Sequence, residues 1–360
     1  MLLGAHTMDK SSRMNWIDTA KGISIILVVM MYATYNTGEY TGEVGFMHYV
    51  ISFATPFRMP EFFMISGLFL SNVISRPWAR YADRRVVHYF YFYAIWAFIM
   101  LALKVGIFSA DPMQMMHELG LAVIEPYGVL WFIYMLGVFS VVAKLLWQFR
   151  APHWVVIPLG AALHMAGIQS VSYIVTQFSA YFVFFYLGYA AATLVFRLAA
   201  WVDENTRAGI LFLAAWALVN GFMVYSPGFA IEPVKTDMGM IAAFPPVHFV
   251  LAVAGSLALC VAGVLLSKLT AMEWLRWLGE HSLVVYLSFT IPMSIFRGIA
   301  LKSGLLTDTG YLSLAVLIVS VASPVLLYAL IKRFGKGDFL FERPQWAHLR
   351  TQTPSVVPGE

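Results

Sequence analysis

The sequence is poor in charged residues. Asp, Glu, Lys and Arg make up 12% of the 360 residues, whereas about 25% is typical of soluble domains. Hydrophobic residues make up 60%, and the mean hydropathy is +0.75. This composition excludes an ordinary soluble domain and indicates an integral membrane protein. Cysteine is also scarce, since Cys260 is the single one, and no intrachain disulfide is possible.

Several catalytic motifs are missing as well. The sequence has no His-Glu-x-x-His zinc element, no Gly-x-x-x-x-Gly-Lys-Ser/Thr loop, no Gly-x-Ser-x-Gly elbow and no Cys-x-x-Cys pair. We therefore expect neither a metal site nor a bound cofactor. The basic residues follow one membrane face, where anionic lipid attracts them. The lipid bilayer is the expected partner, and nucleic acid is not.

Long hydrophobic runs are abundant. About 20 apolar residues in a helix cross the roughly 30 Å hydrocarbon core of a bilayer. The pattern predicts an all-α integral membrane protein with about ten transmembrane helices. They are expected near residues 21–37, 46–73, 86–107, 127–149, 153–168, 178–196, 208–225, 247–268, 282–301 and 311–331.

The rest of the predicted organisation is simple. Residues 1–20 form an N-terminal segment, residues 21–334 form one transmembrane domain, and residues 335–360 form a polar tail that we expect to be disordered. Ten helices place both termini on one side of the membrane.

Basic residues divide unevenly between the two predicted sides. Eighteen fall on the side of the termini and four on the other, with Arg58 inside the membrane. The positive-inside rule then predicts a multi-pass protein of the plasma (inner) membrane with cytoplasmic N- and C-termini. The four basic residues on the outer side are Lys104, Lys235, Arg297 and Lys302.

One hydrophobic segment contains two charged residues, Arg58 and Glu61. A charge at the centre of a transmembrane helix costs about 2.5–3.5 kcal/mol, so such residues usually face the protein interior or a wet cavity and mark function. Residues three apart share one face of a helix, and the two side chains could neutralise each other. Such an ion pair would either line a functional site or only hold the helices together. Pro56 and Pro60 leave backbone carbonyls unpaired, which protein or water must satisfy.

Several segments resemble the signatures of the acyltransferase-3 family, integral-membrane enzymes that modify cell-envelope glycans. The most specific is Phe-Arg-Met-Pro-Glu-Phe-Phe-Met-Ile-Ser-Gly-Leu-Phe-Leu at 57–70, which resembles the second-helix signature. The first-helix signature is matched by Arg-Met-Asn-Trp-Ile-Asp-Thr-Ala-Lys-Gly-Ile-Ser at 13–24. Weaker similarity lies at 130–136, 184–189 and 277–287, and the whole resemblance covers most of residues 13–331.

This resemblance implies a function. The family transfers an acyl group, often acetyl and sometimes succinyl, from cytoplasmic acyl-CoA to a hydroxyl of a glycan or another acceptor at or beyond the membrane. Acyl-CoA is the donor substrate, and no cofactor is bound. A non-catalytic relative, acting in transport or export of a polysaccharide or small solute, is the alternative.

The chain departs from the family pattern at two places in the first helix. Where the family usually has an arginine and, eleven residues later, a histidine, this chain has Lys21 and Tyr32. A further family histidine falls near Phe289. The missing histidine favours the non-catalytic alternative, whereas the segment with Arg58 and Glu61, together with Trp131, favours the enzyme.

The catalytic residues expected from the sequence are therefore His48, Tyr32, Arg58 and Glu61. Arg58 would stabilise the oxyanion. Either Tyr32 or His48 would replace the missing base; we favour His48, with Tyr32 orienting a substrate, because an imidazole titrates near neutral pH and a phenol does not. Lys21, Arg84, Arg85 and Trp131 are expected to bind the donor, although Arg84 and Arg85 would serve equally well as topology determinants. Of the other histidines, His164 is assigned to the short fifth segment and His248 to an outer connection.

Overall fold

The computed structural model describes residues 10–107, 112–304 and 306–349, with side chains from residue 15 onward. Their regular secondary structure is helical apart from one short hairpin, β1 (Ala230–Glu232) and β2 (Lys235–Asp237), which pair antiparallel. The helices are α1 (Lys10–Thr41), α2 (Phe46–Ala54), α3 (Arg58–Leu68), α4 (Trp78–Ala82), α5 (His88–Leu101), α6 (Pro112–Ile124), α7 (Trp131–Gln148), α8 (His153–Met165), α9 (Tyr173–Ala190), α10 (Ala192–Glu204), α11 (Thr206–Val224), α12 (Met240–Ala243), α13 (Pro245–Ser267), α14 (Glu273–Glu280), α15 (Ser282–Ser288), α16 (Thr290–Ser303) and α17 (Thr309–Phe334). Short π and 3₁₀ turns complete the fold: η1 (Asp83–Val87), η2 (Ala102–Ile107), η3 (Gly128–Leu130), η4 (Thr270–Met272), η5 (Asp338–Leu340) and η6 (Gln345–Ala347).

The all-α prediction is confirmed, and the expected ten spans are matched in part. Six helical segments of the described chain are long and apolar enough to cross a membrane, and two bent pairs, α9 with α10 and α15 with α16, raise the number to eight. The other two predicted spans are the short α8, of 13 residues, and the region of α2 and α3, of 9 and 11 residues. Ten crossings therefore remain a prediction.

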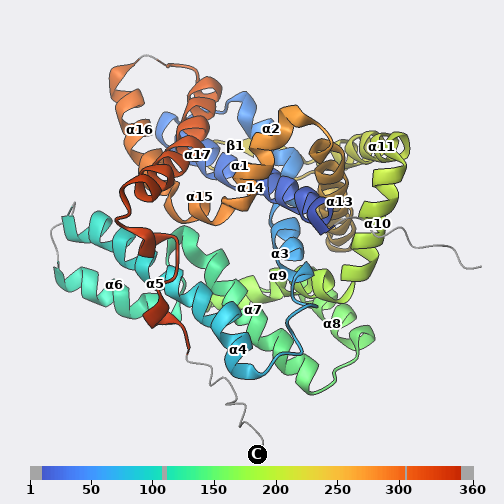
Figure 1. The fold of residues 1–360 in the computed structure, drawn as a ribbon. Helices are drawn as coiled ribbons and strands as arrows, with labels where there is room; N and C mark the ends of the chain where they lie inside the picture. Colours follow the sequence, from blue (N-terminus) through green and yellow to red (C-terminus); the bar gives the residue numbers. More distant parts are fainter. Residues whose placement is uncertain (1–9, 108–111, 305, 350–360) are drawn as a thin grey trace, which may run out of the picture.

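Helix α1 runs through the middle of the bundle and packs against α13, α14 and α17 (Figure 1). It begins before residue 21, the predicted start of the membrane domain. Trp16 and Ile17, which precede that boundary, are already buried in the bundle. The Trp16 ring lies edge-on to Phe196, 6.0 Å between centroids. Part of the segment expected to precede the membrane domain is thus inside it.

The hydrophobic stretch around Arg58 is broken into two helices. Helix α2 ends before Pro56, and α3 starts at Arg58, so Pro60 falls in the first turn of α3, where its missing N–H leaves no intrahelical hydrogen bond unmade. Helix α3 then lies directly against α9, because a Cβ atom on Gly67 would overlap the backbone of Phe185 and one on Gly188 would overlap that of Met64. Glycines at such crossings let two membrane helices approach closely.

The two ends of α1 define two sides of the bundle. The hairpin lies at its carboxyl end, where the Tyr35 hydroxyl contacts Thr236 Oγ1 at 2.8 Å, and we call this the hairpin side. Helix α17 starts there too, since Thr309 Oγ1 lies 3.1 Å from Thr41 Oγ1, and it ends on the opposite side, the terminal side.

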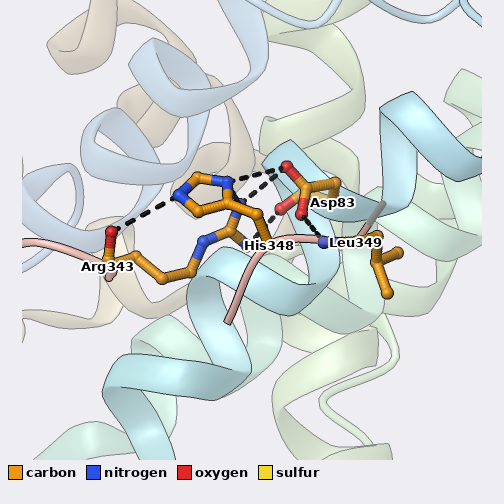
Figure 2. A network of polar contacts seen from close by, with 4 residues as sticks. All are labelled: Asp83, Arg343, His348 and Leu349. Atoms are coloured by element: carbon orange, nitrogen blue, oxygen red, sulfur yellow. Dashed lines mark hydrogen bonds and ion pairs between the residues drawn. The ribbon is translucent and has the colours of Figure 1, made fainter. Parts of the chain in front are cut away.

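The segment after α17 is folded back onto the bundle over residues 335–349, which differs from the expected disorder. It passes beside α5, where the Trp96 indole donates a hydrogen bond to the carbonyl of Leu340 at 2.9 Å (Figure 1). Its end is tied to Asp83, whose carboxylate accepts bonds from Arg343 and from the Leu349 N–H, both at 2.7 Å (Figure 2). These tertiary contacts order a segment whose composition is polar. Residues 350–360 lie outside the described residues.

Candidate functional site

Helix α3 lines two cavities that open toward different sides of the bundle. Arg58, in its first turn, lines a cavity that also reaches Met238, the residue after the hairpin. Phe62, one turn later, lines a second cavity with Lys21, in the amino-terminal half of α1. The first cavity therefore lies toward the hairpin side and the second toward the terminal side, with α3 as their common wall.

The cavity toward the hairpin side has a volume of about 390 Å³. This is within the range of about 300–1,000 Å³ usual for small-molecule sites. The Arg58 guanidinium makes one hydrogen bond among the described residues, from Nη1 to Thr55 Oγ1 at 3.0 Å, and its Nε is buried without a partner. A guanidinium has five N–H donors. Most of those of Arg58 are available to a ligand in this cavity.

Two histidines share this cavity with Arg58. The rings of His164, on α8, and His248, on α13, are stacked with centroids 5.2 Å apart and planes 11° apart. His164 Nε2 lies 3.2 Å from His248 Nδ1, and His164 Nδ1 lies 2.7 Å from the carbonyl oxygen of Ala180. The cavity wall thus contains a cation and a connected pair of imidazoles.

The cavity toward the terminal side is narrower and more apolar, with a volume of about 140 Å³. Phe62 and Phe132, stacked at 4.4 Å with an angle of 4°, form part of its wall. Lys21, Ser66 and Ser282 supply its few polar groups. Its small volume and mainly apolar lining suit a short apolar group rather than a bulky polar molecule.

Tyr32 lies near Arg58 in a group of aromatic rings. Its hydroxyl lies near the Trp131 indole, and Arg58 and Tyr181 lie within electrostatic range. Phe289 packs against the Tyr32 ring with centroids 5.4 Å apart. The structure therefore brings Tyr32, Arg58 and Trp131 together. The sequence had predicted that Trp131 binds the donor, with Lys21, Arg84 and Arg85.

Glu61 does not pair with Arg58. Its carboxylate is fully buried and hydrogen-bonded to the Ser24 hydroxyl on α1, and its other oxygen, Oε1, has no partner among the described residues. No ion pair of Arg58 or Glu61 occurs in the described part of the chain. The expected neutralisation is wrong, because Glu61 faces α1 whereas Arg58 faces the cavity.

His48 is buried away from the cavity, at the carboxyl end of α1. Its Nδ1 accepts from the Gly45 N–H at 3.1 Å, and its Nε2 lies 3.0 Å from the carbonyl oxygen of Pro233 in the hairpin turn. Since a carbonyl only accepts, Nε2 carries the proton. Both ring nitrogens are thus occupied by backbone, and His48 lacks a free nitrogen for a substrate. Beside it, the hydrogen bond to Asp237 and the nearby Glu232 raise the pKa of Lys235.

The predicted donor-binding residues are only partly assembled. Lys21 lines the terminal-side cavity and is also paired with Asp18 at 3.0 Å. Arg85 donates to the hydroxyl of Tyr89, which lines the same cavity, at 3.3 Å. Arg84 is exposed and does not line it.

Sequence reasoning missed the pair His164 and His248. The two residues are 84 positions apart, and each lies in an apolar helix without a recognisable motif around it. The available signal was weak: a single histidine near the end of each of two hydrophobic segments.

The helical fold and the buried charged site define a multi-pass membrane protein. The sequence matches the acyltransferase-3 family, whose model is described as an acyltransferase domain, over residues 14–329. Because the match covers nearly the whole chain, this protein belongs to that family. No curated protein and no solved structure matches the chain.

Proposed function

We propose that this membrane acyltransferase moves an acyl group from acyl-CoA, on the terminal side, to a hydroxyl of an envelope or secreted glycan on the hairpin side. The observation that carries the proposal is the position of Arg58 and Phe62. They lie one turn apart on α3 and line different cavities. A donor in one cavity and an acceptor in the other would meet at this helix.

The terminal-side cavity supports a thioester donor with a short acyl group, acetyl or succinyl. Its volume of about 140 Å³ corresponds to about five water molecules at roughly 30 Å³ each. A short acyl chain and part of a pantetheine arm match this volume, and the nucleotide would remain at the mouth. Lys21 and Arg85 would meet its phosphates there, since cations favour phosphate.

The hairpin-side cavity supports the acceptor and the chemistry. The acceptor oxygen attacks the thioester carbonyl and forms a tetrahedral intermediate with a negatively charged oxygen. The free N–H groups of Arg58 stabilise this charge as it develops. Tyr32, beside Trp131 and Arg58, orients the thioester.

The distribution of basic residues supports a cytoplasmic terminal side. This orientation gives the donor cavity access to cytoplasmic acyl-CoA and the acceptor cavity access to the outer surface. A reporter fused after Gly335 should then be active only in the cytoplasm, and one inserted near Lys235 only outside. The opposite result at either position contradicts the orientation.

Proteoliposomes test the transfer itself. Acetyl-CoA, which does not cross the bilayer, is supplied outside, and neutral hexose oligosaccharides are enclosed inside. We expect acetylated oligosaccharide in the lumen and free CoA outside. Acetylation that occurs only when both substrates share one compartment contradicts the two-sided proposal, and absence of any CoA release contradicts the enzymatic function.

A further inference from the structure

The hydrogen bonds of the two cavity histidines determine where their protons lie. His164 Nδ1 must carry a proton, because the carbonyl of Ala180 only accepts. In the neutral ring His164 Nε2 is then an acceptor, so His248 Nδ1 donates to it. His248 Nε2 is left as the nitrogen with a free lone pair, and no partner for it occurs among the described residues.

This arrangement is that of an oriented general base. A second group that fixes the tautomer of an imidazole and accepts its N–H also stabilises the imidazolium formed when the ring takes up a proton. Here His164 supplies that acceptor, and it is itself held by the backbone of α9. His248 lines the same cavity as Arg58, so base and oxyanion-stabilising cation face one space.

We propose that His248 is the general base of the acyl transfer and that His164 is its positioning residue. This inference rests on the proposed function. The O–H bond of the acceptor breaks, and its proton goes to His248 Nε2. The oxygen forms a bond to the acyl carbon, and the C–S bond breaks with its electrons on sulfur. The CoA thiolate takes a proton from water on its own side, and His248 returns its proton to water in the cavity.

The assignment explains how the chain works without the family's first-helix histidine. Tyr32 stands at that position and is engaged with Trp131, while His48 is occupied by backbone on both nitrogens. His248 reaches the same space as Arg58 from α13 instead of α1. In this proposal the general base lies on α13, whereas in the family pattern it lies on the first helix.

The test compares two acceptors of acetyl-CoA in the detergent-purified full-length protein. Neutral hexose oligosaccharides need a base to deprotonate their hydroxyl groups. Hydroxylamine is already unprotonated at neutral pH, so its acetylation needs Arg58 but no base. We expect His248→Gln to lower kcat for the oligosaccharides by about 100-fold or more, the usual contribution of a general base. Its rate of acetyl hydroxamate formation should stay within about threefold of the wild type.

Two further variants separate positioning from structure. His164→Phe keeps a ring for stacking and removes the acceptor of the His248 N–H, and we expect kcat to fall about tenfold with KM unchanged. His164→Gln retains an amide that can accept from His248 and donate to Ala180, and we expect it to recover most of the activity. His153→Gln is the matched control, because His153 is exposed and contacts Tyr186 outside both cavities.

The outcomes distinguish the base from the function. If the wild type acetylates neither acceptor, the proposed function fails, and the base assignment with it. If the wild type is active, Arg58→Lys is inactive and His248→Gln acetylates oligosaccharides normally, the function stands and His248 is not the base. Equal losses with both acceptors in His248→Gln also overturn the assignment, because they indicate a structural role.

Discussion

The two cavities beside α3 differ in what they offer a ligand. The hairpin-side cavity has a guanidinium with free donors and two connected imidazoles, and its volume is about 390 Å³. The terminal-side cavity, about 140 Å³, is lined mainly by apolar and aromatic side chains. The first cavity offers polar and charged groups, and the second offers mainly apolar surface. Helix α3 thus separates a polar cavity from an apolar one.

The largest effect is expected at the polar cavity, from Arg58→Lys. A lysine keeps the charge and loses the planar set of N–H donors. Removing one donor to an oxyanion typically costs about 10²–10³-fold in kcat, so we expect a loss of this size in CoA release from acetyl-CoA. Arg207→Lys, at an exposed arginine, is the control. Normal turnover in the Arg58 variant would contradict the proposed role of the guanidinium in stabilising the oxyanion.

The apolar cavity is tested by filling it with Ser66→Phe. Ser66 lines the cavity, and its hydroxyl bonds only the carbonyl of Phe62 in its own helix among the described residues. A phenyl ring there should block the donor and raise the KM for acetyl-CoA by about tenfold or more, with less effect on kcat. Ser71→Phe is the matched control, because Ser71 is exposed and bonds its own turn in the same way. An unchanged KM would contradict donor binding in this cavity.

Tyr32→Phe tests the aromatic group beside Arg58. The change keeps the ring against Phe289 and removes the hydroxyl that lies near Trp131 and Arg58. We expect kcat to fall about tenfold, because the thioester is less well oriented. A loss of 100-fold or more would instead indicate that the phenol acts as an acid or base.

His48→Ala should change stability far more than catalysis. It leaves the Gly45 N–H and the Pro233 carbonyl without their partner, at about 1–3 kcal/mol for each buried group. We expect a lower free energy of unfolding and a kcat within about threefold of the wild type. His48→Asn, which can still bond Gly45, should be less destabilised. A severe loss of kcat in a stable His48→Ala protein would restore His48 as the candidate base.

The smallest effect on catalysis is expected at the folded-back C-terminal segment, which lies outside both cavities. Asp83→Asn removes the charge that pairs with Arg343, whose side chain is 4% exposed (Figure 2). Losing one partner of a buried pair is destabilising, so residues 335–349 should exchange amide hydrogens faster in the variant. The KM for acetyl-CoA should change less than threefold. Unchanged exchange would show that the contacts with α5 alone hold the segment.

Some features of the fold follow from local sequence. The segment around Arg58 was predicted to line a site, because a charge between prolines in an apolar run has a cost that only a cavity or partner offsets. The hydrophobic runs predicted a helical membrane protein, because about 20 apolar residues in a helix cross the bilayer. The ion pair of Arg58 with Glu61 was expected from their spacing and does not form, since spacing on one helix cannot show that Ser24 of α1 is the nearer partner.

The sequence by itself determined the membrane class, the family and the segment that contains Arg58, because composition and short motifs are local properties. The tertiary structure decided which histidines share a cavity with Arg58, that Glu61 forms no ion pair with a described residue, and that residues 335–349 are folded onto the bundle. His164 and His248 are far apart in the chain, and only the packing of α8, α9 and α13 brings their rings into contact. His48 is near Arg58 in sequence, but its Nε2 is paired with the carbonyl of Pro233 in the hairpin turn and does not face the cavity of Arg58. Helix packing depends on how the side chains of distant segments fit together, and a local sequence pattern does not contain this information.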